Sequence, residues 1–225
     1  MASVSTVPPL IIRPISKHTA TVIFLHGLGD TGFGWKDEME GTLRFPHIKY
    51  VLPHAAMRPF SFYNGTKMTA WFDRYSMGWD CKEDNYGIEQ ARNYIYNLID
   101  QEVNAGIPSH RILLGGFSMG GALALYSGLT CPRKLSGILA LSCFIMQKDQ
   151  FPMACTANRN TALFYGTGDR DDIVPLEMVQ KSADFIQNFH EDTRLTVYKG
   201  LEHAVSFQEL DDIKTFISTC LPKID

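Results

Sequence analysis

One serine stands where a predicted strand turns sharply into a predicted helix, a position suited to a nucleophile. The strand is the apolar run 111–114, and the small, helix-forming run 122–126 follows. Ser118 lies between them with glycine two residues away on each side, Gly116 and Gly120, which is the G-x-S-x-G pattern of a nucleophile elbow. The serine needs a strained backbone there, and a Cβ at either glycine would collide with neighbouring chain. The pattern predicts nucleophilic catalysis, although a glycine-rich turn can carry such a serine by chance.

A serine hydroxyl is a weak nucleophile at neutral pH, so the site needs a base. In chains with this elbow the order is serine, then an acid, then histidine. Of the seven histidines, only His190 and His203 follow Ser118. His190 ends a predicted helix, where we expect a surface histidine. His203 follows the last predicted strand, from which a loop can reach the serine, so we predict that His203 is the base.

The acid that orients this base is expected in the stretch 168–175, which leaves a predicted strand. Three aspartates lie there within four residues, Asp169, Asp171 and Asp172. Spacing alone does not choose among them. The same residues would also fit an acidic, solvated turn that caps the helix beginning after Pro175.

An oxyanion hole requires two backbone N–H groups, one from the residue after the nucleophile and one from an early strand-to-helix loop. The first is Met119. The second is expected from the glycine-rich turn 26–32, and we select Leu28. His26 precedes the serine in the chain, so we interpret it as a structural residue that holds this turn by a side-chain hydrogen bond.

Strands and helices alternate along the chain. Strands are predicted at 10–15, 19–25, 48–52, 111–115, 135–141, 161–166 and 194–198, and helices at 34–43, 86–106, 119–130, 175–189 and 206–220. This order predicts an α/β fold, a mostly parallel central sheet with helices on both faces. Pro14 makes the first strand an edge strand. The loops that carry the candidate residues all follow strands, so we expect them to meet at the carboxyl ends of the strands.

Two stretches, 53–85 and 144–160, are predicted to be irregular. The first is crowded with aromatic residues, among them Trp71, and the second carries several apolar residues. Long loops in compact domains are usually functional. These side chains, with Trp71 as one candidate, could line a groove for an apolar substrate, or each could be ordinary core packing.

Length and composition favour a single domain over residues 1–225. The chain is 45% hydrophobic and 20% charged, with a formal net charge of -3 and no basic stripe, which argues against nucleic acid as a partner. The longest apolar run, 138–146, is too short to span a bilayer. Residues 1–5 lack the features of a secretory signal. Five cysteines without a C-x-x-C pair indicate reduced thiols and no metal site, so we expect a cytoplasmic protein.

Several motifs together resemble the acyl-protein thioesterase and lysophospholipase family of small α/β-hydrolases. They are H-G-L-G-D-T-G at 26–32, W-F-D at 71–73, I-P-S-H-R-I at 107–112, G-G-F-S-M-G-G at 115–121, L-S-C at 141–143 and L-P-K-I-D at 221–225. The resemblance implies an α/β-hydrolase fold and cytosolic hydrolysis of S-palmitoyl thioesters on proteins and of lysophospholipid esters. It implies no metal and no organic cofactor.

The resemblance also implies residue roles. The family's acidic loop, G-D-x-D-x-x-V-P, matches 168–175 and assigns the triad carboxylate to Asp171. Leu28, Phe144 and Ile173 would line the acyl site. Two features depart from the thioesterases proper: Met119 stands where glutamine is frequent, which is more similar to the lysophospholipase-like branch, and positions 2–7 contain no cysteine for a lipid anchor.

We therefore expect a serine hydrolase acting on S-acylated proteins. The alternatives are a short-chain carboxylesterase or lysophospholipase with little activity on proteins, and a non-catalytic hydrolase fold that only binds ligands. The apolar loops would also suit transient membrane contact or a weak homodimer.

Overall fold

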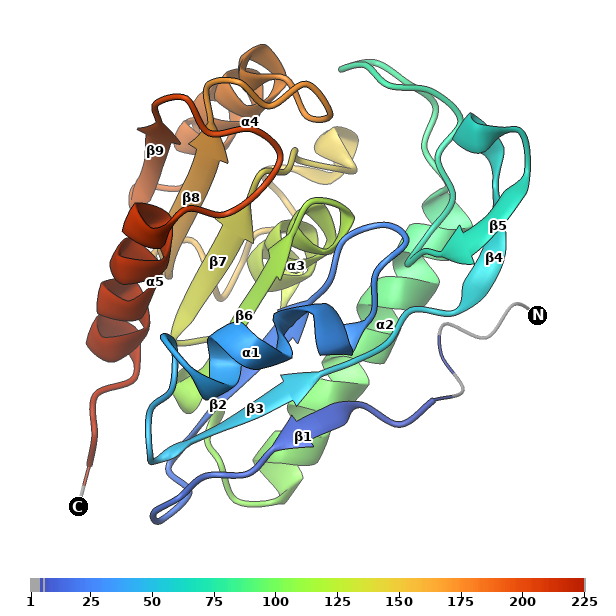
Figure 1. Ribbon diagram of the computed structural model, residues 1–225. Coiled ribbons are helices and arrows are strands. Elements are labelled where there is room, and N and C mark those ends of the chain that lie inside the picture. The colour runs from blue at the N-terminus through green and yellow to red at the C-terminus, as the bar shows by residue number, and fades with distance from the viewer. Residues whose placement is uncertain (1–4, 6, 225) are drawn as a thin grey trace.

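Seven strands form one sheet in the computed structural model, which describes residue 5 and residues 7–224 (Figure 1). The spatial order is β1-β3-β2-β6-β7-β8-β9, and only the edge strand β1 runs antiparallel to its neighbour. The bounds are β1 Leu10–Ile12, β2 Ala20–Leu25, β3 Ile48–Leu52, β6 Ile112–Phe117, β7 Gly137–Leu141, β8 Ala162–Gly168 and β9 Thr193–Tyr198. The predicted mostly parallel sheet, with its first strand at the edge, is confirmed.

Helices cover both faces of the sheet. Buried residues of α2 Asn85–Asn104, α3 Met119–Thr130 and α4 Leu176–Gln187 belong to the core on one face. Buried residues of α1 Lys36–Glu40 and α5 Phe207–Cys220 belong to the core on the other face. All six residues of β2 are buried, as expected for a strand with helices on both sides.

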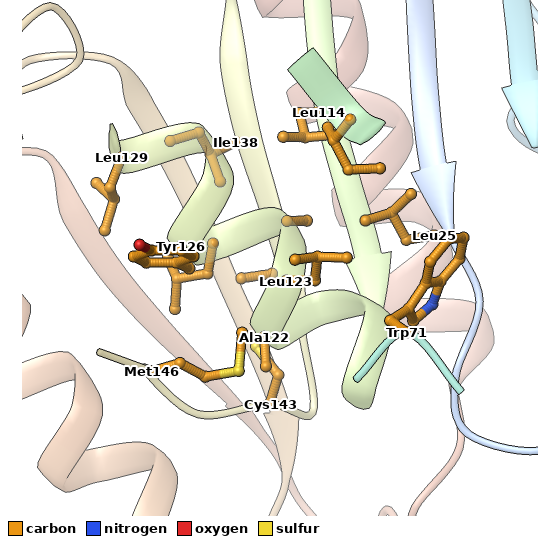
Figure 2. Packing of buried hydrophobic residues seen from close by; sticks show 14 of the residues in the cluster. Leu25, Trp71, Leu114, Ala122, Leu123, Tyr126, Leu129, Ile138, Cys143 and Met146 are labelled. Carbon is orange, nitrogen blue, oxygen red and sulfur yellow. The ribbon is translucent and has the colours of Figure 1, made fainter. Parts of the chain in front are cut away.

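Helix α3 lies at the centre of the larger core and carries the elbow serine at its N-cap. Every residue from Met119 to Leu129 is buried. Figure 2 shows Leu123 and Tyr126 of this helix among apolar side chains that include Leu114 of β6 and Ile138 of β7. A helix that is apolar all round is buried on all sides. The segment following the elbow is therefore held rigidly against the sheet.

The stretch 53–85 contains structure that the sequence analysis missed. Residues β4 Met57–Phe60 and β5 Thr66–Thr69 form an antiparallel hairpin apart from the main sheet. The tip turns at Asn64 and Gly65, both with positive φ. Both strands are short and partly exposed, and Pro59 interrupts the pattern, so no alternation of apolar residues signalled them.

Smaller differences concern helix ends and one histidine. The helix predicted over 34–43 is a 3-10 turn, Gly32–Trp35, followed by the single short helix α1. Other 3-10 turns cover Ser61–Tyr63, Ser109–Arg111 and Lys148–Gln150. The prediction that His190 lies at the surface is wrong. The residue is 1% exposed, and its Nδ1 lies 2.9 Å from the Thr193 hydroxyl oxygen, which supplies a partner for the buried ring.

The five cysteines are free thiols, and Cys143 is buried. None of the helices within residues 7–224 has both the length and the apolar character needed to span a bilayer. The predictions made for the N-terminal segment fall mostly on residues 1–4 and 6, which lie outside the described residues, as does Asp225 of the C-terminal motif.

Candidate active site

Ser118 occupies a strained backbone conformation between β6 and α3. Its φ is 55° and its ψ is -123°, a region that residues with a side chain rarely adopt. Two hydrogen bonds hold it there: its N–H donates to Leu141 O at 2.8 Å, and its carbonyl accepts from Ala122 N–H at 2.9 Å. Strain of this kind persists where surrounding structure fixes it, which is typical of functional sites.

The two elbow glycines are required by close backbone contacts. A Cβ at Gly116 would meet the carbonyl of Gly120, and a Cβ at Gly120 would meet the carbonyls of Leu25 and His26. These neighbours are backbone atoms, so no side chain can move aside. The strand, the turn and the helix can approach this closely only with glycine at both positions.

His203 lies between Ser118 and Asp171. Its Nε2 is 2.9 Å from Ser118 Oγ, and its Nδ1 is 2.7 Å from Asp171 Oδ2. A proton on Nδ1 directed at the carboxylate leaves Nε2 free to accept from the serine hydroxyl. The imidazole also packs on the Phe117 ring, with centroids 4.8 Å apart. The geometry therefore allows the imidazole to take a proton from Ser118.

Of the three candidate acids, Asp171 is the one that contacts His203. Its side chain is fully buried, and its second oxygen accepts hydrogen bonds from Ile173 N–H at 3.0 Å and Val174 N–H at 2.8 Å. Asp169 instead accepts from Gly200 N–H at 2.6 Å, and Asp172 is exposed beside the cavity. Backbone donors on one oxygen and the imidazole on the other fix the Asp171 carboxylate in place.

The two amides selected for the oxyanion hole belong to residues that line one cavity with Ser118. Within the described part of the chain, no hydrogen bond is formed by the N–H of Leu28 or of Met119. The turn that carries Leu28 is held by His26, whose Nε2 accepts from Ala55 N–H at 3.0 Å and whose Nδ1 lies 2.7 Å from Gly27 O. Burial lowers the pKa of His26 and favours the neutral ring that these bonds require. The prediction that His26 holds this turn is confirmed.

The structure does not bring Trp71 into the cavity, in contrast to its selection as a substrate-binding residue. Its indole is fully buried, and its Nε1–H donates to His26 O at 2.9 Å. Its ring also lies 4.9 Å from the His26 ring. A buried indole needs an acceptor for its N–H, and the carbonyl of His26 supplies it. Trp71 thus supports the turn that carries Leu28.

The cavity at Ser118 and His203 has a volume of about 520 Å³ and mostly apolar walls. Leu28, Phe144 and Ile173, which the resemblance selects for the acyl site, all line it. The hairpin and the segment that follows it add residues that the sequence analysis did not select individually: Phe60, Phe62, Tyr63, Met68, Arg74 and Met77. Arg74 is the one charged residue among these six. In the sequence, a basic residue within an aromatic stretch could have drawn attention to it. Among the described residues, no three His, Cys, Asp or Glu side chains are grouped as ligands for a metal ion.

The family model for phospholipases and carboxylesterases matches residues 8–221. The chain belongs to this family. Acyl-protein thioesterase 1 of Neurospora crassa is 37% identical over 235 residues, covering 100% of this chain and 96% of that protein. Acyl-protein thioesterase 1 of Gibberella zeae is 40% identical over 227 residues, covering 96% of this chain and 97% of that protein.

A solved structure gives the same result at the level of the fold. The crystal structure of Zea mays acyl-protein thioesterase 2 superposes with a TM-score of 0.86 at 30% identity, covering 95% of this chain and 98% of that one. The resemblance drawn from the motifs and the α/β-hydrolase fold are thus confirmed, and the chain is a member of a family of serine hydrolases.

Proposed function

We propose that this chain is a serine hydrolase that removes acyl groups from thioesters and esters, with S-palmitoylated proteins as its main substrates. The observation that carries the proposal is the continuous hydrogen-bonded series Asp171, His203 and Ser118, which opens into an apolar cavity. The relatives named acyl-protein thioesterase support the substrate class. The apolar lining suits a fatty acyl chain, because burial of its methylenes is favourable.

In the proposed mechanism, Ser118 Oγ attacks the acyl carbonyl while its proton passes to His203 Nε2. Asp171 stabilises the imidazolium that forms. The N–H groups of Leu28 and Met119 donate to the tetrahedral oxyanion. The carbon–sulfur or carbon–oxygen bond then breaks, and the leaving group takes the proton from His203. Water, deprotonated by His203, releases the acyl group from Ser118 in the same way, and the reaction needs no cofactor.

The proposal places this activity in the cytoplasm, where S-acylated proteins present their thioesters. Phe62, Tyr63 and Ile173 are exposed apolar residues that also line the cavity. They would rest against lipid in transient membrane contact, or against a second copy in a weak homodimer. We propose neither a transmembrane anchor nor a nucleic-acid partner for this activity.

Labelling of the folded protein with a fluorophosphonate probe tests the nucleophile. We expect a single labelled residue, Ser118, and loss of labelling in Ser118→Ala. Ser218→Ala is the matched control, because Ser218 is exposed on the distant helix α5 and should leave labelling unchanged. Folded wild-type protein without label on Ser118 would refute the proposal and leave a ligand-binding module as the alternative.

The substrate class is tested by p-nitrophenyl esters of increasing chain length, run beside palmitoylated peptides. A long-chain thioesterase should keep or gain kcat/KM as the acyl chain lengthens. A sharp fall beyond short chains would contradict the proposed substrate class and favour a short-chain carboxylesterase or lysophospholipase.

A further inference from the structure

Arg74 is a buried arginine whose guanidinium forms no hydrogen bond and no ion pair within the described part of the chain. Its side chain belongs to a residue that is 6% exposed, and its Nε is buried without a hydrogen bond. The hydrogen bonds found for Arg74 are made by its backbone: its N–H donates to Asp73 Oδ1, and its carbonyl accepts from Phe62 N–H. Buried arginines are normally paired with a carboxylate or bound to carbonyl oxygens.

The guanidinium lies in the wall of the active-site cavity. Arg74 lines the same cavity as Ser118, Met119 and Phe144. Its Cζ lies 4.1 Å from the centroid of the Phe144 ring, so the guanidinium is held against that ring by a cation–π contact. The guanidinium is therefore held at the cavity wall with N–H donors that form no hydrogen bond within the described residues.

The acids nearest in the chain are already engaged. Asp73 accepts hydrogen bonds from the N–H and hydroxyl of Ser61. Glu83, whose backbone pairs with that of Arg74, accepts from the backbone and side-chain N–H groups of Gln147. Burial lowers the pKa of the Arg74 guanidinium, and Cys81 and Glu83 offset only part of this effect; arginine keeps its proton in proteins, so the charge remains. An unpaired charge in an apolar wall is costly, and an anion from the ligand would offset that cost.

We propose that Arg74 is a specificity-determining residue that binds an oxyanion group, carboxylate or phosphate, carried by the ester substrate. The inference rests on the proposed function and narrows its substrate class to acyl esters or thioesters with a negative charge that reaches Arg74 when the carbonyl lies at Ser118. A guanidinium offers two parallel N–H donors that match the two oxygens of either anion. The anion sits at the far end of the acyl group or on the leaving group, and both positions are tested below.

Two matched substrate pairs separate these positions. For the acyl side, the pair is the 4-methylumbelliferyl monoester of adipic acid and its neutral ethyl ester. For the leaving-group side, the pair is hexanoyl glycerol phosphate and hexanoyl glycerol. In wild type we expect kcat/KM to favour the anionic member of one pair by about tenfold, as a charged hydrogen bond supplies. The pair that shows the preference identifies the source of the anion.

Arg74→Gln should abolish that preference, so that the ratio of kcat/KM between the anionic and the neutral member of the pair falls to about one. Arg74→Lys should keep part of the preference, because it keeps the charge but loses the paired donors. Lys67→Gln is the matched control: it removes one positive charge from the exposed strand β5 and should leave the preference intact. Equal rates within both pairs in wild type, or a preference that survives Arg74→Gln, would overturn the proposal.

A binding measurement keeps this test independent of turnover. Calorimetry with hexyl phosphate and with hexanoate should give a Kd about tenfold weaker for Arg74→Gln than for wild type, with hexanol unaffected. Equal Kd values in both proteins would overturn the anion site even if Ser118 labels normally, whereas absent labelling with intact anion binding would overturn only the proposed function. A purely structural arginine would instead show itself by a lower Tm in Arg74→Gln without any change in Kd.

Discussion

Replacement of Glu209 by glutamine should make the protein more stable at alkaline pH. Glu209 lies in the first turn of α5, 0% exposed, and both its carboxylate oxygens are buried without a hydrogen bond among the described residues. Its side chain faces Gly166 of β8, where a Cβ would lie 2.5 Å from Oε1. Burial is the main cause that raises the pKa of this carboxyl to about 7; the nearby backbone of Ser206 opposes the shift in part, and Asp212 adds to it. Tyr198 does not supply a hydrogen bond to the Glu209 carboxylate, because its hydroxyl donates to Asp212 instead.

The direction and size of the effect follow from the two pKa values. An unfolded chain loses the Glu209 proton near the ordinary glutamate pKa of 4.5, whereas the folded protein keeps it up to a pH of about 7. Below 4.5 both states are protonated, so the group does not affect stability. As pH rises from 4.5 to about 7 the unfolded state is increasingly favoured, and above that range the full penalty remains. A shift of this size corresponds to roughly 3 kcal/mol.

Urea unfolding of wild type and Glu209→Gln at pH 5 and pH 8 measures this penalty. The difference in unfolding free energy between the two proteins should move by roughly 2–3 kcal/mol in favour of the variant between these pH values. Other titrating groups cancel because both proteins contain them. Glu202→Gln, an exposed residue just before α5, is the control and should show no such change. A difference that is the same at both pH values would refute the assignment of a protonated, buried Glu209.

Two further substitutions test how the elbow and its turn are held. Gly120→Ala should lower both Tm and labelling of Ser118, with a stability loss of about 1–3 kcal/mol, because the added methyl meets the backbone carbonyls of Leu25 and His26. Gly128→Ala on the same helix meets only the side chain of Ile138, and an equal effect there would contradict this explanation. Trp71→Phe removes the N–H that donates to His26 O. We expect kcat to fall about tenfold with little change in KM, as for a displaced oxyanion donor. An unchanged kcat would contradict the supporting role given to Trp71.

The parts of the site that depend on local sequence could be predicted. The elbow needs glycine at two fixed positions around Ser118 for steric reasons that act within a few residues, so its pattern was visible without the fold. Helix α3 begins and ends where the sequence indicated, at Met119 and Thr130. Chain order was enough to select His203, because the loop after the last strand of a parallel sheet opens at the same edge as the elbow.

The parts of the site that depend on packing between distant segments could not be predicted from the sequence. The hairpin β4–β5 supports the turn of Leu28 through a hydrogen bond from Gly29 N–H to Thr69 O at 2.9 Å, a contact between residues forty positions apart. Its strands are too short and too exposed for periodicity to show them. Arg74 and Trp71 follow this hairpin in the chain. The sequence therefore did not predict that Arg74 lines the cavity or that Trp71 is buried away from it.

The acidic stretch 168–175 shows why spacing could not choose the acid. Hydrogen bonding between β8 and β9 continues past the strands, with Asp169 N–H donating to Tyr198 O at 3.1 Å and Arg170 N–H to Leu201 O at 3.0 Å. These bonds set the acid loop beside the loop of His203, and Asp169 ties the two together at Gly200. Asp171 is then the residue that turns inward to the imidazole, while Asp172 stays exposed at the cavity. The three neighbouring carboxylates therefore have three different surroundings. The register of β8 and β9 decides which of them contacts His203, and the spacing of residues within the loop does not encode that register.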